Sequence, residues 1–119
     1  MDKNKIMLGG NLFHYGVSKY NTHKLLDLSI DNNINALDTA NVYSNGASEK
    51  YIGEYFLKRK NRSKWFVATK LGVAKGWKTK LPGDFLATKK NILLEIDRSL
   101  KRLKTDYIDL YQIHHFDRY

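Results

Sequence analysis

The 119-residue chain contains no cysteine and no long apolar run. The absence of cysteine excludes disulfides, thiolate metal sites and cysteine nucleophiles. No run approaches the roughly 18 apolar residues that a membrane-spanning helix needs. The first ten residues, MDKNKIMLGG, lack the apolar core of a signal peptide. We therefore expect a cytoplasmic protein with no membrane partner, and we predict no metal site.

Basic residues are abundant, but they form no nucleic-acid-binding motif. The net charge is +9, and fifteen of the 21 Lys and Arg residues lie between Lys58 and Lys104. A basic face can attract nucleic acid or phosphate-bearing ligands. These residues are scattered over predicted helices and a loop, with no RNP-like or zinc-finger pattern. We interpret them as solvated surface and predict no nucleic-acid partner; a basic nucleic-acid-binding domain is an alternative that rests on charge alone.

The apolar pattern predicts one domain in which strands and helices alternate. With 42% hydrophobic and 28% charged residues, the composition is globular. Each strand-helix unit takes about 30 residues, which indicates parallel strands joined by helical crossovers. The predicted strands are residues 5–13, 34–38, 65–70 and 107–114. The predicted helices are residues 22–32, a segment starting at Ser48 and residues 84–103, and residues 72–83 are predicted to form a long loop.

Capping residues and helical spacing predict the helix ends and the buried faces. Thr22 and Asp84 are the expected N-caps of the first and third helices. The second helix is expected to turn Gly53 inward as a close-packing position. The side chains expected inside are Leu25, Leu26, Leu28 and Ile30 in the first helix, Ile52, Tyr55 and Phe56 in the second, and Leu86, Ile92, Leu93, Ile96, Leu100 and Leu103 in the third.

Three predicted strands end in a titratable side chain. Asp38 follows the apolar run of the second strand, Lys70 that of the third and His114 that of the fourth. Tyr43 comes five residues after Asp38, on the loop before the next helix. An α/β barrel builds its active site at the carboxyl ends of its strands. The four side chains are therefore candidates for one site.

Taken singly, these residues have ordinary explanations, but together they form a proton-transfer set. Asp38 alone could cap the following turn, and Tyr43 alone could be a half-buried loop aromatic. A phenol has an ordinary pKa of about 10, and a nearby ammonium lowers it by favouring the phenolate. A carboxylate keeps that ammonium charged, and a histidine can donate a hydrogen bond to a bound carbonyl. Because no amino acid supplies a hydride, carbonyl reduction here implies a nicotinamide cofactor.

The segments around these residues resemble the signature of the aldo-keto reductase family, in matching order and spacing over essentially the whole chain. The segments are DTANVY (38–43), ASEKYIG (47–53), ATKLG (68–72) and DYIDLYQIH (106–114). The resemblance implies that Tyr43 is the general acid and that Lys70 lowers its pKa. It further implies that Asp38 is the counter-ion of the lysine and that His114 orients the carbonyl.

The resemblance also implies a fold, a reaction and a cofactor. The fold would be the N-terminal half, about four βα units, of a (β/α)8 TIM barrel with parallel strands. The reaction would be the NADP(H)-dependent reduction of a small-molecule aldehyde or ketone to an alcohol. Gly10, Asn11 and Asp38 would lie beside the NADP(H) cofactor.

The chain departs from the family pattern in two ways. Ser44 stands where the family most often has glycine after the tyrosine, a mild change because serine also tolerates turns. A full barrel needs about 250 residues, so we expect residues 1–119 to be a single partial domain truncated after the fourth strand. Unpaired strand edges pair readily with other chains. We expect the isolated chain to self-associate or to need a complementary half-barrel, without turnover alone.

Two expectations concern the substrate and one alternative concerns the function. Val42, Phe13, Trp77 and His115 are candidates for the wall of a substrate pocket, although Trp77 could equally anchor a loop. Because side chains alternate along a strand, we expect His114 to point into the barrel and His115 outward or toward the loop. The alternative function is a non-catalytic half-barrel fragment that acts as an interaction or assembly module.

Overall fold

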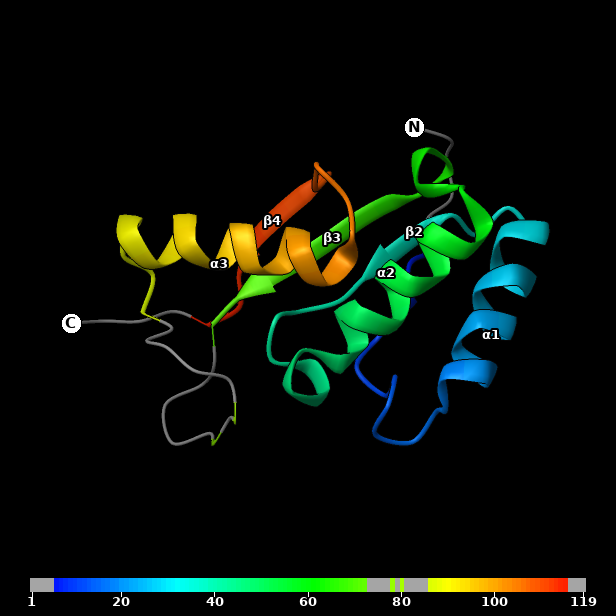
Figure 1. Ribbon diagram of the computed structural model, residues 1–119, viewed down its shortest axis with the longest axis horizontal. Helices are drawn as coiled ribbons and strands as arrows, with labels where there is room; N and C mark the ends of the chain where they lie inside the picture. The colour runs from blue at the N-terminus through cyan, green and yellow to red at the C-terminus, as the bar shows by residue number, and fades with distance from the viewer. Residues whose placement is uncertain (1–5, 73–77, 79, 81–85, 116–119) are drawn as a thin grey trace.

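The computed structural model describes residues 6–72, 78, 80 and 86–115, which form one parallel sheet with helices on a single side (Figure 1). The strands are β1 (Leu8–Gly9), β2 (Ala36–Asp38), β3 (Phe66–Leu71) and β4 (Leu110–Ile113). They lie in the order β1-β2-β3-β4, and every neighbouring pair is parallel. The helices are α1 (Lys19–Asp31), α2 (Ala47–Arg59) and α3 (Lys89–Leu103), with 3-10 turns η1 (Tyr43–Gly46) and η2 (Arg62–Lys64). The predicted parallel α/β architecture is confirmed.

The strands are shorter than the apolar runs that predicted them. β1 contains two residues, and Phe13, expected in the same strand, instead forms an isolated bridge with Val17. β4 begins at Leu110 rather than Tyr107. The reason is that the Asp109 carboxylate accepts a hydrogen bond from the Val67 backbone N–H (2.8 Å), so a side chain replaces a strand partner there.

Helix α1 begins earlier than predicted and buries a narrower face. Its N-cap is Ser18, whose backbone is extended and whose hydroxyl accepts a hydrogen bond from the Asn21 backbone N–H (3.2 Å). The predicted N-cap Thr22 is wrong, because this residue lies within the helix and is fully buried. Leu26 is buried as predicted, whereas Leu25 and Leu28 are exposed.

The buried face of helix α3 differs from the face that the sequence predicted. Its N-cap is Thr88, whose hydroxyl accepts from the Asn91 backbone N–H (3.2 Å), and the predicted cap Asp84 lies outside the described residues. The apolar face predicted for the interior is wrong in part: Leu103 is buried, but Leu93 is 56% exposed. The side chains that α3 buries are Asn91, Glu95, Ser99 and Leu103, a stripe at spacing of four that is mostly polar.

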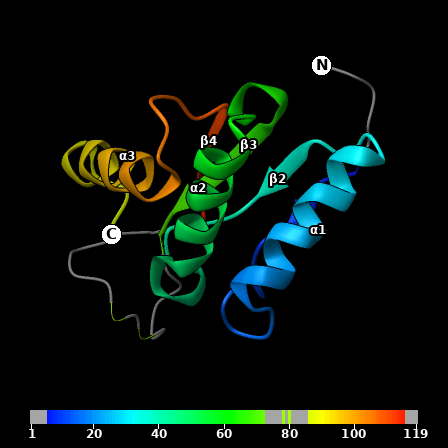
Figure 2. The ribbon, with the colours of Figure 1, turned by 45° about the vertical axis from the view of Figure 1, so that its right-hand side comes forward.

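Helix α2 packs between α1 and α3 and covers the centre of the sheet (Figure 2). The inward direction predicted for Gly53 is confirmed, because a Cβ atom there would lie 2.2 Å from the Arg102 carbonyl oxygen. This position therefore brings the backbones of α2 and α3 into direct contact. The buried apolar cluster around it consists of Phe13, Leu26, Leu37, Ile52, Tyr55, Phe56, Trp65, Val67 and Leu103.

The direction of the strands determines where a site can form. Because all four strands are parallel, their carboxyl ends share one edge of the sheet. Over the part of the chain that the structure describes, none of the helices combines the length and apolar content needed to cross a membrane.

Candidate functional site

An ion pair between two neighbouring strands forms the base of the candidate site. Asp38 is the last residue of β2, and Lys70 lies near the end of β3. The Lys70 Nζ donates to the Asp38 Oδ2 (2.8 Å) and to the Thr39 carbonyl oxygen (2.8 Å). The side chains are 13% and 34% exposed respectively, so the ammonium is nearly enclosed while the carboxylate still reaches solvent. The lysine side chain is thereby held in place at the strand ends by two hydrogen bonds.

Tyr43 is placed by a turn with an unusual backbone. Ser44 and Asn45 have φ values of 50° and 52°, and Gly46 has a φ of 87°. Such left-handed conformations favour glycine, and Ser44 is anchored there because its hydroxyl donates to the Phe13 carbonyl oxygen (2.7 Å). The serine that departs from the family pattern is thus accommodated by a side-chain hydrogen bond. The turn begins at Tyr43 and leads directly into α2.

The four predicted side chains come together around the ring of Tyr43. The Lys70 Nζ lies 5.1 Å from the centroid of this ring. On another side, the His114 ring meets it edge-on, with centroids 5.5 Å apart and an angle of 82° between planes. The structure therefore brings a phenol, an ammonium, a carboxylate and an imidazole to one end of the parallel sheet.

His114 is half-buried, and its surroundings disfavour the imidazolium. Burial lowers the pKa of His114 below its ordinary value, and the nearby His115 and Lys70 lower it further. The Gly72 backbone passes close by, where a Cβ atom would lie 3.6 Å from the His114 Cβ. Gly72 has a φ of 122°, a conformation that a side chain would strain. The neutral imidazole is thus the favoured form of His114 near pH 7.

The two histidines do not diverge as strand alternation would require. Their rings stack, with centroids 4.6 Å apart and 21° between planes. The physical reason is that β4 ends at Ile113, so both residues lie beyond the strand and its alternation. His115 therefore lies against His114.

The residues predicted to lie beside a cofactor are at the end of β1. Gly10 is buried, and its backbone N–H donates to the Asp38 carbonyl oxygen (2.8 Å). Its own carbonyl accepts from the Ser48 hydroxyl (2.7 Å). Asn11 is exposed, and among the described residues a Cβ atom on Gly9 would meet only the Asn11 Oδ1 within 4 Å. A polar amide and an open stretch of backbone thus lie next to Asp38.

The candidates for a substrate wall occupy different environments. Phe13 is only 1% exposed and belongs to the buried apolar cluster, so its side chain packs in the core rather than along an open wall. Its ring lies under Gly10, where a Cβ atom would meet it at 3.2 Å. Val42 is half-buried beside Tyr43, and Trp77 lies outside the described residues.

Sequence reasoning missed the polar residues behind the site. Glu49 and Glu95 are buried carboxylates that face the sheet from α2 and α3. The sequence places Glu49 in the helix that starts at Ser48, without marking it as buried. A signal was available, because it lies three residues before Ile52 and therefore on the same inward helix face.

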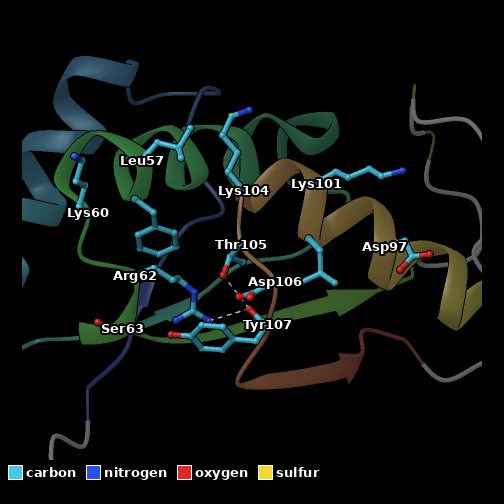
Figure 3. A pocket seen from close by; sticks show the side chains of 12 residues that line it. Leu57, Lys60, Arg62, Ser63, Asp97, Lys101, Lys104, Thr105, Asp106 and Tyr107 are labelled. Atoms are coloured by element: carbon cyan, nitrogen blue, oxygen red, sulfur yellow. Dashed lines mark hydrogen bonds between the residues drawn. The ribbon is translucent and has the colours of Figure 1, made fainter.

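A separate hollow of about 860 Å³ is lined by the residues drawn in Figure 3. It is bounded by α2, η2, α3 and the segment Thr105 to Tyr107, close to the amino ends of β3 and β4. Arg62 lies over the Tyr107 ring there, 3.9 Å from its centroid, and donates to the Asp109 carboxylate (2.7 Å). None of the four strand-end side chains lines this hollow, so it is not the candidate active site.

The sequence matches the family described as the aldo/keto reductase family over residues 5–119. It is 34% identical over 115 residues to Protein tas of Escherichia coli (strain K12). This match covers 90% of this chain and 33% of Protein tas. The sequence is 36% identical over 121 residues to the aryl-alcohol dehydrogenase [NADP(+)] of Phanerodontia chrysosporium, covering 91% and 31%. The chain spans about a third of the length of these curated relatives.

The fold is similar to that of solved aldo-keto reductases. The holo form of an aldo-keto reductase from Bacillus halodurans superposes with a TM-score of 0.75 at 31% sequence identity. The match covers 92% of this chain and 35% of that chain, as expected for about half of a (β/α)8 barrel. Sequence and fold together show that this chain belongs to the aldo/keto reductase family.

Proposed function

We propose that this segment supplies the proton-transfer site of an NADP(H)-dependent reductase that converts an aldehyde or ketone to an alcohol. The observation that carries the proposal is the position of the Tyr43 ring, which lies next to the Lys70 ammonium and the His114 imidazole. Lys70 is in turn paired with Asp38. This set can give a proton to an oxygen and stabilise the charge left behind.

Each residue has a distinct role in this proposal. Tyr43 donates its hydroxyl proton to the carbonyl oxygen of the substrate as that oxygen gains negative charge. The Lys70 ammonium stabilises the resulting phenolate, and Asp38 keeps the ammonium oriented toward it. His114, neutral near pH 7, donates a hydrogen bond that orients the carbonyl.

The end of β1 fits a nicotinamide cofactor in its chemistry. The hydrogen bond from the Gly10 backbone N–H to the Asp38 carbonyl oxygen places the end of β1 beside the candidate site. This segment offers the open backbone at Gly9, the buried Gly10 and the exposed amide of Asn11. When bound, NADP(H) supplies the hydride, which no side chain can provide. The name of the relative from Phanerodontia chrysosporium, which specifies NADP(+), supports this choice of cofactor.

The proposal is tested by Tyr43→Phe in a barrel-length protein that contains this segment, with NADPH oxidation in the presence of small aldehydes as the assay. We expect kcat to fall by about 10²–10⁴-fold, the usual contribution of a general acid. NADPH affinity should change little, because the phenol acts in the proton-transfer step. Tyr20→Phe, at an exposed tyrosine on α1, is the matched control. Retention of more than about a tenth of the rate by Tyr43→Phe would overturn the role of Tyr43.

The exposed edges of the sheet support a second candidate function, that of a half-barrel assembly module. In the described residues, β1 and β4 each pair on one side only. Leu110 and Ile113 of β4 are both exposed. Unpaired apolar edges associate readily with other strands. The 119-residue chain alone would then self-associate or bind a complementary half-barrel, without NADPH turnover.

Sedimentation of the 119-residue chain, with and without a second-half polypeptide, separates the two candidates. Turnover restored by the second half supports a split enzyme, whereas a stable inert dimer supports the module. A dispersed monomer that oxidises NADPH with an aldehyde would contradict the assembly candidate.

A further inference from the structure

Two buried carboxylates lie behind the candidate site, between the sheet and its helices. Glu49 of α2 is fully buried, and Glu95 of α3 is almost fully buried. The Arg102 Nε donates to the Glu49 Oε2 (2.6 Å), and the Arg98 Nη1 donates to the Glu95 Oε1 (2.6 Å). Arg102 also reaches the Glu95 Oε2 at 3.8 Å and so links both acids. Among the described residues, Glu49, Glu95, Arg98 and Arg102 thus form one cluster of paired charges.

Stability alone is a weak explanation for this cluster. A buried ion pair contributes little more to folding than apolar residues of similar size would, because desolvation offsets the attraction. The hydroxyl of Tyr111 is buried beside the cluster with no hydrogen-bond partner among the described residues. Burial and the negative charges of Glu49 and Glu95 raise the pKa of Tyr111, so this hydroxyl stays protonated. The cluster has a more specific effect, because its carboxylates also hold Thr69 and Asn41 in place.

The carboxylates hold the backbone on both sides of the Lys70 and Asp38 pair. The Thr69 hydroxyl donates to the Glu49 Oε1 (2.6 Å), which fixes the residue just before Lys70. The Asn41 Nδ2 donates to the Glu95 Oε2 (3.0 Å). The backbone N–H of Asn41 donates to the Lys70 carbonyl oxygen (3.0 Å). Asn41 thus joins the end of β3 to the turn that carries Tyr43 two residues later.

We propose that Thr69 and Asn41 are positioning residues, which set the distance between the Lys70 ammonium and Tyr43 through their hydrogen bonds to Glu49 and Glu95. The proposal rests on the proposed reductase function. Thr69 faces the helices while Lys70, the next residue along β3, faces the site, so a small rotation of the strand moves the ammonium directly. Misplacement of a catalytic group by about 1 Å can reduce a rate by about 10²-fold.

The variant that tests the proposal is Thr69→Val, which removes the hydroxyl but keeps the shape of the side chain. In the barrel-length protein we expect kcat to fall by about 10- to 100-fold, with KM for NADPH changed less than twofold. The alkaline limb of the kcat profile should move to higher pH, because a displaced ammonium stabilises the phenolate less. Within the described residues, the charged or titratable groups that face Lys70 are Asp38, Tyr43 and His114, and none of them is altered. Thr69→Ser should restore both properties.

The matched control is Thr22→Val, the same substitution at another fully buried threonine. The Thr22 hydroxyl has no hydrogen-bond partner among the described residues, and it lies on α1, away from the cluster. Its kcat and pH profile should stay within twofold of the parent protein. If Thr69→Val does not fold, Asn41→Ala breaks the other link and should produce the same shift of the alkaline limb.

The outcomes separate this inference from the proposed function. A folded Thr69→Val or Asn41→Ala protein with unchanged kcat and pH profile would overturn the positioning role, even where Tyr43→Phe abolishes turnover. If Tyr43→Phe instead retains its rate, the proposed function fails first. A loss of thermal stability without a shift in the pH profile would assign the cluster a structural role only and would also overturn the inference.

Discussion

The two sides of the sheet hold similar ion pairs in different surroundings. On the site side, Lys70 pairs with Asp38, whose side chain is 34% exposed. On the helix side, Arg102 pairs with Glu49, whose side chain is fully buried. The basic partners are about equally enclosed, so the difference lies in the acids. A carboxylate that reaches water can remain charged when its partner moves or is lost, whereas a buried one cannot.

The different exposure of the two acids gives the two ion pairs different expected roles. In the proposed reaction, the site-side pair can adjust as charge develops on Tyr43, because Asp38 reaches solvent. The helix-side pair fixes the framework, because any separation of Glu49 from Arg102 leaves a charge in the interior. The comparison therefore predicts that the site-side pair affects activity with little effect on stability, whereas the helix-side pair affects stability as well as the placement of Lys70 through Thr69.

The largest effect is expected from Lys70→Met in a barrel-length protein. Turnover should fall by about 10²-fold or more, because the phenolate loses its stabilising ammonium. The free energy of unfolding should change by no more than about 1 kcal/mol, since Asp38 remains partly solvated. Steady-state kinetics and urea denaturation measure the two quantities. Large destabilisation with retained turnover would reverse the assignment of the pair.

Glu49→Ala, unlike Lys70→Met, should lower the free energy of unfolding substantially. It leaves the Arg102 guanidinium enclosed without its main partner, and breaking a buried pair in this way costs about 3–5 kcal/mol. Chemical denaturation of Glu49→Ala, Arg102→Ala and the double variant measures the coupling between them. The double variant should be less destabilised than the sum of the single ones. Strict additivity would show that the two side chains act independently.

The exposed pair of Arg59 and Asp27 should show the smallest loss of stability among the three ion pairs. The Arg59 Nε donates to the Asp27 Oδ1 (2.9 Å), but both side chains are substantially exposed. The Arg59 hydrogen bond lowers the pKa of Asp27 below its usual range. Asp27→Asn should therefore cost only about 0.2–1 kcal/mol at pH 7. A loss as large as that of Glu49→Ala would mean that burial does not distinguish the pairs.

The smallest effect concerns His114 and the pH dependence of stability. Because burial lowers the pKa of His114 in the folded state, the unfolded chain binds a proton first as pH falls. Stability from this group is unaffected above pH 6.5 and declines as pH falls from there toward the lowered pKa. NMR titration should give a midpoint below 6.5, and the decline should be absent in His114→Gln. A midpoint above 6.5 would contradict the neutral imidazole at the site.

The sequence predicted the elements better than it predicted their faces. Asp38, Lys70 and His114 were placed at strand ends because an apolar run that stops at a charged group is a local pattern. The face of α3 was predicted wrongly in part, since Leu103 is buried as expected but Leu93 is exposed and the helix buries Asn91 and Glu95 instead. That choice depends on partners that a local pattern does not contain.

By itself, the sequence determined the alternation of strands and helices, the three side chains at or just past their carboxyl ends, and Tyr43 on the loop after the second strand. These are patterns of neighbouring residues. Only the tertiary structure decided which acids are buried and which are solvated. Glu49 meets Arg102 across 53 positions and Asn41 meets Glu95 across 54. Such contacts form when α2 and α3 pack closely at Gly53. The physical reason is that burial, and with it the strength of every charge, is decided by distant parts of the chain.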